Sequence, residues 1–460
     1  MFRKRLEKYY KETFTEVLQT TFNPNGPGAI RIHLIPPETE EGVKSSVVII
    51  NGRDILPVSP NWTVILAEFI KAIDVYDGKT VGDAELNKIY DVTYSGVKKV
   101  LSLYPRKRFE DVLQRIITTF DELSKNQIPT EKIQPISIGD YASNMKAPHR
   151  MDLMVSAMTK GKKWNCNQKC IHCYAAGQKC SGEKELTTEE WKQVLDKCRE
   201  IGISQITFTG GEPTMRKDLP ELISYARWFI SRVNTNGIKL TKKYCKQLVE
   251  AELDGIQITF YSHNKKVHNK LVGVEQYDAT VAGIKNAIEA GLCPSINTPL
   301  CTLNKDYVKT LEFLHSLGVQ YVTCSALIVT GNATKKKSKS TQLSVLELRQ
   351  ILKEAVDYCF ANDMEINFTS PGWIENSYFD ELGISTPTCG ACLSNMAITP
   401  NGNIVPCQSW LSDKPLGNIL TDDWKAVWNS PICKKRREYS SLETGLCPLR
   451  TGHGGIKNEK

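Results

Sequence analysis

Three cysteines lie within eight residues of this sequence, in the segment WNCNQKCIHCY at residues 164–174. Cys166, Cys170 and Cys173 are separated by three and then by two residues. A closed zinc site needs four protein ligands, so it would have to recruit His172 or Cys180 as the fourth. An iron–sulfur cluster held by three thiolates would instead keep one iron open for another molecule. The spacing predicts a metal centre, favours the cluster and leaves zinc open.

A second segment with chemical potential is FTGGEPTMR, at residues 208–216. Gly210 and Gly211 allow the backbone to approach a ligand closely because neither has a side chain. Glu212, which precedes Pro213, offers a carboxylate to an ammonium group. Taken alone, the segment also fits a tight turn between a strand and a helix, so its place after the three cysteines decides its interpretation.

The two segments, one strand–helix unit apart, together resemble the radical SAM superfamily over residues 150–340. The resemblance implies that the three cysteines hold a [4Fe–4S] cluster whose open iron binds S-adenosylmethionine. One electron from the reduced cluster would cleave this cosubstrate to methionine and a 5′-deoxyadenosyl radical, which abstracts a hydrogen atom from the substrate. The resemblance also implies that the cosubstrate contacts Gly210, Gly211, Glu212, Pro213, Tyr174, Thr259 and Asn297.

Six apolar runs alternate with helical patterns between residues 150 and 365 and would position these segments. The runs are MDLMVSAM, SQITFT, FISRVNT, GIQITFY, PSINTPL and QYVTCSALIV. Repeated strand–helix units predict an α/β fold with a parallel sheet and right-handed crossovers, either open or closed. Ligands bind at the carboxyl ends of the strands in such sheets, and the cysteine segment follows the first strand. The family resemblance implies a partial (β/α)6 TIM-like barrel.

A second group of cysteines follows the predicted barrel. The turn Pro400-Asn401-Gly402 predicts a hairpin that brings Cys392 and Cys407 together. The spacing of these cysteines about Gly402 resembles the SPASM extension of radical SAM enzymes, but the later paired cysteines of that pattern are missing. Because five cysteines cannot complete two four-thiolate clusters, we expect one auxiliary [4Fe–4S] cluster in a shortened, twitch-like domain.

The expected ligands of the auxiliary cluster are Cys389, Cys392, Cys407 and Cys447, with Cys433 in reserve. A second, incompletely ligated cluster and a zinc ribbon remain alternatives for this small cysteine-rich domain. Paired CX2C knuckles, which a zinc ribbon normally uses, are not repeated here.

The residues before the barrel predict a small α+β module. The extended runs AIRIHLI and SVVIINGRDILPV carry the hairpin signal Asn51-Gly52, and helical patterns follow at residues 62–73 and 107–125. This module resembles the winged-helix elements that bind a leader peptide by strand addition. The stretch NQIPTEKIQPISIGD predicts a linker. The expected domains are residues 1–135, 145–365 and 380–460.

Composition limits the remaining possibilities. The net charge is +8, and the most basic stretch, KKKSKS at residues 335–340, predicts a solvated loop. No RNA-binding signature is present, no apolar run reaches membrane-spanning length, and the start MFRKRLEKYYKETF has no apolar signal region. We therefore expect a cytoplasmic protein whose 15 cysteines are not paired as disulfides, with no nucleic-acid or membrane partner.

The resemblance implies an enzyme that modifies a peptide or protein, by thioether or carbon–carbon crosslinking, oxidation or epimerisation. The expected partners are a peptide or protein substrate, with or without a leader peptide, and a flavodoxin or ferredoxin as electron donor. A tetrapyrrole- or small-molecule-tailoring enzyme is the alternative. A third hypothesis, an iron–sulfur sensor without catalytic activity, is disfavoured by the Gly-Gly-Glu-Pro turn.

Overall fold

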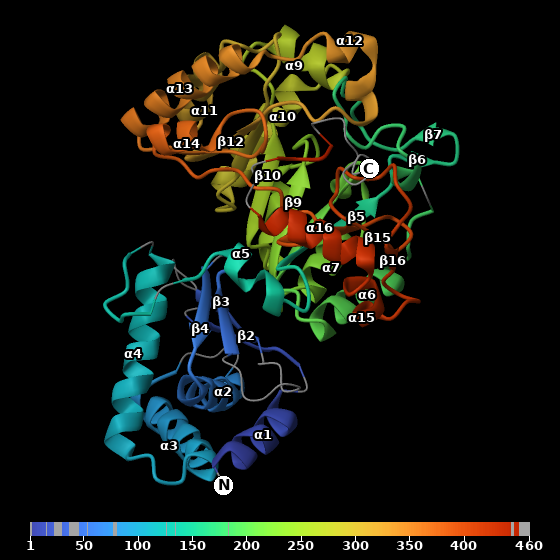
Figure 1. Ribbon diagram of the computed structural model, residues 1–460. Helices are drawn as coiled ribbons and strands as arrows, with labels where there is room; N and C mark the ends of the chain where they lie inside the picture. Colours follow the sequence, from blue (N-terminus) through green and yellow to red (C-terminus); the bar gives the residue numbers. More distant parts are fainter. Residues whose placement is uncertain are drawn as a thin grey trace. The chain divides into compact units, whose positions relative to one another are not determined.

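The structure is a computed structural model (Figure 1). It describes residues 2–14, 16–22, 30–35, 46–52, 54–76, 81–125, 127–133, 135–182, 184–442 and 446–449. The chain divides into two compact units. One comprises Met1–His149 with Cys198–Ser204, and the other comprises Arg150–Lys197 with Gln205–Lys460.

The first unit contains a four-stranded antiparallel sheet in the order β1-β2-β3-β4. Its strands are β1 (Leu18–Phe22), β2 (Ile30–Ile35), β3 (Ser46–Ile50) and β4 (Asp54–Val58). Asn51 and Gly52 both have positive φ, 49° and 65°, as a type I′ turn requires. The predicted hairpin is therefore confirmed, whereas β1 lies outside the predicted runs.

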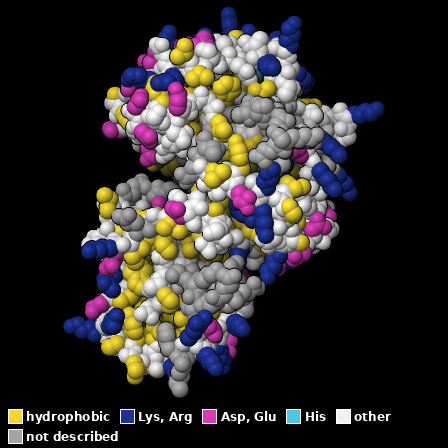
Figure 2. Space-filling model, in the orientation of Figure 1, with side chains coloured by type: hydrophobic (Ala, Val, Ile, Leu, Met, Phe, Trp, Pro, Cys, Tyr) yellow, Lys and Arg dark blue, Asp and Glu magenta, His cyan; other side chains and the backbone are white. Residues whose placement is uncertain are grey.

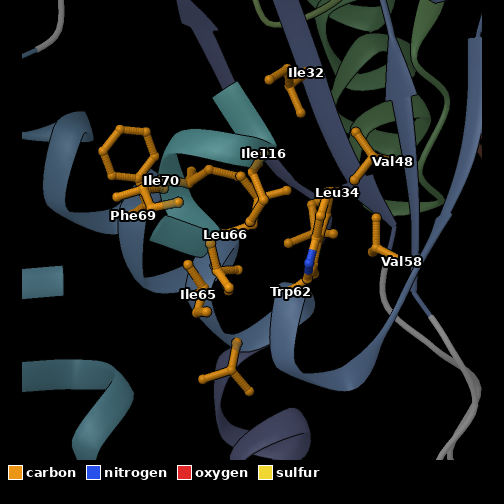
Figure 3. Close-up of a cluster of buried hydrophobic side chains, with 14 of the residues drawn as sticks. Ile32, Leu34, Val48, Val58, Trp62, Ile65, Leu66, Phe69, Ile70 and Ile116 are labelled. Atoms are coloured by element: carbon orange, nitrogen blue, oxygen red, sulfur yellow. The ribbon is translucent and has the colours of Figure 1, made fainter. Parts of the chain in front are cut away.

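Four helices complete this unit: α1 (Phe2–Thr13), α2 (Pro60–Asp74), α3 (Asp83–Val100) and α4 (Arg106–Ser124). Helix α2 begins where the hydroxyl of Ser59 accepts from Trp62 N and Pro60 occupies the first turn. Figure 3 shows its apolar residues packed among side chains of the sheet and of α4. Two of these helices match the predicted ranges, α3 was not predicted, and a short helix, α5 (Ile138–Tyr141), lies in the predicted linker.

The second unit is built on a ten-stranded sheet in the order β13-β12-β11-β10-β9-β8-β5-β14-β15-β16. Its first eight strands in this order, β13 to β14, are mutually parallel. The predicted runs form β5 (Arg150–Ser156), β8 (Gln205–Gly210), β9 (Ile230–Thr235), β10 (Gly255–Thr259), β11 (Ser295–Pro299) and β12 (Tyr321–Ser325). The sheet has two edges, so it is open, and a strand not predicted, β13 (Glu365–Phe368), extends it.

Helices connect the parallel strands (Figure 1). They are α6 (Thr188–Glu200), α7 (Leu219–Tyr225), α8 (Lys242–Glu250), α9 (Lys265–Val272), α10 (Tyr277–Glu289), α11 (Tyr307–Ser316), α12 (Lys336–Lys339), α13 (Val345–Ala361) and α14 (Asn376–Leu382). A short hairpin, β6 (Thr159–Lys160) with β7 (Lys163–Trp164), follows β5. Among the described residues, no helix is long and apolar enough to cross a membrane.

The C-terminal elements continue the same sheet. They are β14 (Asn395–Ile398), β15 (Asn403–Val405), β16 (Gly417–Asn418), α15 (Trp424–Trp428) and α16 (Pro431–Ser441). Strand β14 pairs in parallel with β5, and β15 returns antiparallel to it. The second cysteine group is therefore attached to the strand that leads into the first.

One face of the parallel sheet is polar. On β10, Gln257 and Thr259 are half-buried, whereas Ile256 and Ile258, which alternate with them, are buried. Asn297 on β11 lies beside Thr259 in the strand register and shows the same alternation. A parallel sheet that is buried on both faces is apolar throughout, so the half-exposed polar face is available to a ligand.

Candidate metal and cosubstrate site

The three-cysteine segment is a loop held by hydrogen bonds from distant parts of the chain. Asn332, after β12, donates from its backbone nitrogen to Cys173 O at 2.9 Å and from its side chain to Cys170 O at 3.0 Å. The hydroxyl of Ser338 donates to Ile171 O at 2.7 Å. These bonds occupy the backbone of the loop, so its three thiols are placed by the fold rather than by local sequence alone.

The three thiols lie near one another and are free of disulfides. Burial raises the pKa of Cys166 to about 12 and also raises that of Cys173. Burial raises the pKa of Cys170 well above its usual value, and Cys173 and Cys166 add to this effect. Burial and mutual repulsion make it costly to ionise these thiols together. A cationic metal group that replaces their protons would remove this cost. In the described part of the chain, no three His, Cys, Asp or Glu side chains are grouped closely enough to hold a single metal ion.

The two residues considered as a fourth zinc ligand have other neighbours. His172 Nε2 lies 2.7 Å from the hydroxyl oxygen of Thr341, and burial lowers the pKa of His172 to about 4. Cys180 is buried, with its sulfur 3.9 Å from the carbonyl oxygen of Asp413.

The Gly-Gly-Glu-Pro turn packs directly on the end of β5. Gly210 has φ of +131°, and a Cβ there would lie 2.2 Å from Ser156 O. A Cβ on Gly211 would lie 3.0 Å from Ala157 O, and the carbonyl of Gly211 is 3.6 Å from Cys166 Sγ. The first glycine is therefore required by sterics, and the turn as a whole borders the cysteine loop.

Glu212 is a buried carboxylate held by neutral donors. It accepts from the hydroxyls of Thr214 and Thr235, both at 2.6 Å, and from Asn236 N at 2.8 Å. Burial raises the pKa of Glu212, and these hydrogen bonds oppose that rise. No described cation pairs with this carboxylate, so its charge is uncompensated, as a site for an ammonium group requires.

The remaining predicted cosubstrate residues are distributed around this centre. Pro213 is buried in the turn. Thr259 and Asn297 lie side by side at the ends of their strands, and Asn297 Oδ1 accepts from the hydroxyl of Thr323 at 3.0 Å. The hydroxyl of Tyr174 donates to Gln408 Oε1 at 3.2 Å, so this ring faces the C-terminal segment.

The second cysteine group forms two close pairs with a fifth thiol between them. Cys389 and Cys447 share a side-chain hydrogen bond that raises the pKa of Cys389. Cys392 and Cys433 form a second pair, in which the hydrogen bond raises the pKa of Cys392 and lowers that of Cys433. Burial raises the pKa of Cys407 to about 12, and its thiol interacts with Cys389, Cys392 and Cys447. The predicted four ligands are thus together, and Cys433 joins them through Cys392.

Two arginines of α16 flank this group. Arg437 donates to Cys433 Sγ at 3.6 Å and lies over the ring of Trp428, 3.8 Å from its centroid. Arg436 lies over the ring of Trp410 at 4.2 Å and forms an ion pair with Asp413 at 3.3 Å, while its buried Nε and Nη1 atoms find no hydrogen-bond partner in the described structure. Cations beside these thiols fit a group of thiolates that binds as an anion.

Several amide side chains of the site carry no signal in the sequence. Gln178 joins the two cysteine regions: its Nε2 donates to Ser409 O and its Oε1 accepts from Leu411 N, both at 3.2 Å. Asn167 accepts from Asn236 Nδ2 at 2.6 Å and ties the cysteine loop to the end of β9. Their position next to or near cysteines is the one feature that could have indicated them.

Residues 165–314 match the radical SAM superfamily, and residues 389–448 match the SPASM iron–sulfur cluster-binding domain. The chain carries a radical SAM domain and a SPASM domain. Both domains were predicted from the sequence. The radical SAM domain implies a [4Fe–4S] cluster and S-adenosylmethionine, as predicted, and the SPASM domain implies auxiliary iron–sulfur clusters, where the sequence predicts one.

Curated relatives extend this comparison. Fe-coproporphyrin III synthase of Methanosarcina barkeri is 33% identical over 198 residues, which cover 41% of this chain. The match spans about half of that relative, 48% of its length. Mycofactocin maturase MftC of Mycolicibacterium smegmatis is 25% identical over 294 residues, which cover 61% of this chain and 72% of the relative.

Among solved structures, SuiB of Streptococcus suis bound to its precursor peptide SuiA resembles this fold with a TM-score of 0.58. The sequence identity is 15%, and the alignment covers 88% of this chain and 92% of SuiB. The likeness shows a common fold.

Proposed function

We propose that this protein is a radical SAM enzyme that modifies a peptide or protein. The observation that carries the proposal is the packing of the three-thiol loop against the Gly-Gly-Glu-Pro turn, with an uncompensated Glu212 carboxylate at its side. We place the first cluster on Cys166, Cys170 and Cys173 and the auxiliary cluster on Cys389, Cys392, Cys407 and Cys447, with Cys433 in reserve. We retain the three domains 1–135, 145–365 and 380–460.

The bound cluster and S-adenosylmethionine supply a 5′-deoxyadenosyl radical when one electron is available. The chain's own residues orient the cosubstrate. Glu212 binds its ammonium group, while Gly210 and Gly211 let the backbone approach it. Thr259 and Asn297 would contact its polar groups from the sheet, and Tyr174 would contact the adenine.

A peptide substrate is supported by the relatives. MftC is named a mycofactocin maturase, and SuiB is solved with a precursor peptide. We propose that the N-terminal module, resembling a winged-helix element, binds a leader peptide by strand addition. Strand β1 offers an edge for this purpose, whereas the other edge strand, β4, is interrupted by Pro57.

Metal content and product analysis test the proposal together. Anaerobically isolated protein should carry roughly eight irons per chain, two cubane clusters' worth. Replacing the three cysteines of the first loop by alanine should leave roughly four irons and abolish formation of 5′-deoxyadenosine. Mass spectrometry of a peptide encoded beside this protein and coexpressed with it should show a changed mass. Colourless protein with tightly bound zinc would end the radical SAM proposal.

A second candidate is tailoring of a tetrapyrrole, because the Methanosarcina barkeri relative is named Fe-coproporphyrin III synthase. The two candidates predict different binding. A tetrapyrrole enzyme should bind a coproporphyrin tightly and leave the neighbouring peptide unchanged, whereas a peptide maturase should do the reverse.

A further inference from the structure

The segment after β12 covers the cysteine loop although its sequence predicts a solvated loop. Residues Gly331–Thr334 form one 3-10 turn, and α12 follows directly. Ala333 and Ser338 are buried, whereas Lys335, Lys336, Lys337 and Lys339 are exposed. We call these four residues the α12 lysines. Their side chains face solvent while the backbone that carries them is anchored.

The anchor is the cysteine loop itself. Ser338, between two of the α12 lysines, donates its hydroxyl to Ile171 O at 2.7 Å. The hydroxyl of Thr341, which follows them, lies 2.7 Å from His172 Nε2. Ile171 and His172 are the two residues between Cys170 and Cys173. The segment with the α12 lysines is therefore attached to the same loop that carries the three thiols.

The two chain segments that form this surface carry charges of one sign. Residues 160–182 and residues 313–346 contain lysines but no aspartate or glutamate. Across the described residues none of the α12 lysines has an ion pair, whereas Lys265 pairs with Asp278 and Lys305 with Glu347. Figure 2 shows lysine and arginine side chains projecting over α12. Unneutralised charges on one small surface steer an oppositely charged partner toward it.

We propose that the α12 lysines form the docking surface for an acidic one-electron carrier protein, a flavodoxin or a ferredoxin. The inference rests on the proposed function, which needs one electron for each cosubstrate molecule cleaved. The carrier loses one electron to the group held by Cys166, Cys170 and Cys173. No bond forms and no proton moves in this step. Because electron transfer slows steeply with distance, a carrier must approach this loop closely.

The position of the α12 lysines favours a redox protein over a nucleic acid as their partner. A nucleic acid needs a longer track of phosphate contacts, and a four-residue helix with three lysines and one more before it does not provide one. The direct contact between this segment and the thiol loop has no use in binding a polyanion, but it is required of an electron-entry surface.

The test compares two sets of charge reversals in the full holoenzyme. The first variant replaces all four α12 lysines by glutamate. The matched control replaces Lys239, Lys243, Lys285 and Lys309, which are exposed lysines of the same unit, by glutamate. The probe is a purified flavodoxin of net negative charge. Its Kd is measured by calorimetry, and its reduction of the protein is followed by stopped-flow bleaching of the iron–sulfur absorbance without S-adenosylmethionine.

The α12 variant should bind flavodoxin at least tenfold more weakly and bleach correspondingly more slowly, because four attractive charges become repulsive. The control should match the unchanged protein, and added salt should weaken binding of the unchanged protein most. Bleaching and cosubstrate cleavage driven by dithionite, a small reductant, should be the same in all three proteins.

Three results would overturn the proposal. Equal flavodoxin affinity in the α12 variant and the control would remove the docking surface. Loss of iron or of dithionite-driven bleaching in the α12 variant would assign these lysines to support of the loop. Weaker binding of the peptide substrate or of an oligonucleotide, with flavodoxin binding intact, would assign the surface to that ligand. Failure of dithionite to produce cosubstrate cleavage in the unchanged protein would instead contradict the proposed function.

Discussion

At the scale of single residues, the site depends on buried polar groups with incomplete compensation. Glu212 lies in the interior and is held by neutral donors alone. Burying a charge without a counter-ion is costly, so such a group is retained where a ligand completes it. Its geometry is set before the ligand arrives, because the hydroxyls and backbone nitrogen that hold it belong to two adjacent strand ends.

Replacing Glu212 by glutamine should weaken binding of S-adenosylmethionine by about 1.5–3 kcal/mol, the usual contribution of a hydrogen bond to a charged group. Calorimetric titration of the iron-loaded protein measures this change. The matched control is Glu221→Gln, since Glu221 pairs with Lys192 at the surface of α7. Equal affinity in Glu212→Gln and the unchanged protein would remove Glu212 from the cosubstrate site.

His268 is a residue of the core rather than of the site. It is fully buried against Phe260, with ring centroids 4.9 Å apart, and burial lowers its pKa from 6.5 to about 4. The folded protein therefore holds His268 neutral, whereas the unfolded chain takes up a proton below pH 6.5. The contribution of His268 to the free energy of unfolding is therefore largest above pH 6.5, and it decreases as the pH falls from 6.5 toward 4.

Between pH 7.5 and 5.5, this titration should lower the free energy of unfolding by about 1.4 kcal/mol. His268→Phe keeps the aromatic packing and removes the titration, so its stability should depend on pH less by that amount. Anaerobic denaturant unfolding at both pH values checks this. An identical pH dependence in the two proteins would show that His268 is not held neutral.

At the scale of elements, the segment that crosses the cysteine loop needs a glycine. Gly331 has φ of +55°, and a Cβ there would lie 2.4 Å from Cys173 O and 2.3 Å from Tyr174 O. These are backbone atoms, so the loop and the crossing segment would have to separate. Gly318 has φ of +90° but no described atom within 4 Å of such a Cβ. A side chain at Gly318 would therefore meet backbone strain alone, whereas a side chain at Gly331 would meet backbone strain and a collision with the cysteine loop.

Gly331→Ala should lose iron from the first cluster and destabilise the protein by about 2–4 kcal/mol, the sum of left-handed backbone strain and overpacking. Gly318→Ala should cost about 1 kcal/mol and keep its iron. Iron analysis and thermal unfolding of both variants decide this. If the two variants behave alike, the close approach at Gly331 does not hold the loop.

At the scale of the whole molecule, the two compact units contain different parts of the proposed enzyme. The sheet of the second unit carries both cysteine groups, because β14 of the SPASM domain pairs with β5. Gln178 and Tyr174 add side-chain bonds between the two cysteine regions. The two groups are therefore parts of one rigid framework, whereas the N-terminal module has its own hydrophobic core.

A variant lacking residues 1–135 should keep its iron and cleave S-adenosylmethionine slowly. It should lose most turnover on a full precursor peptide and little on the isolated core peptide, because capture of the leader raises the local concentration of the reacting segment. Turnover of both peptides by the truncated and intact proteins is the measurement. Undiminished modification of the full precursor would contradict leader binding by this module.

The sequence by itself determined the chemistry of the first site and the order of the strands that carry it. The spacing of Cys166, Cys170 and Cys173 and the Gly-Gly-Glu-Pro turn are local patterns that need no folded chain to be recognised. The alternation of apolar runs with helical patterns likewise predicts the six parallel strands, because a strand buried in a sheet is apolar in any fold. Strands β1 and β13 and helix α3 were not predicted from the sequence because their patterns are short or largely polar.

Tertiary structure alone decided which residues support the two cysteine groups. Asn332 reaches the carbonyl of Cys170 across 162 residues of chain, and Cys433 meets Cys392 through the placement of α16. Such contacts depend on how the sheet opens and how its helices turn, and no local spacing encodes them. The lysines of α12 show the same limit, since their composition predicts a solvated loop and only the fold places that segment against Ile171 and His172 of the cysteine loop.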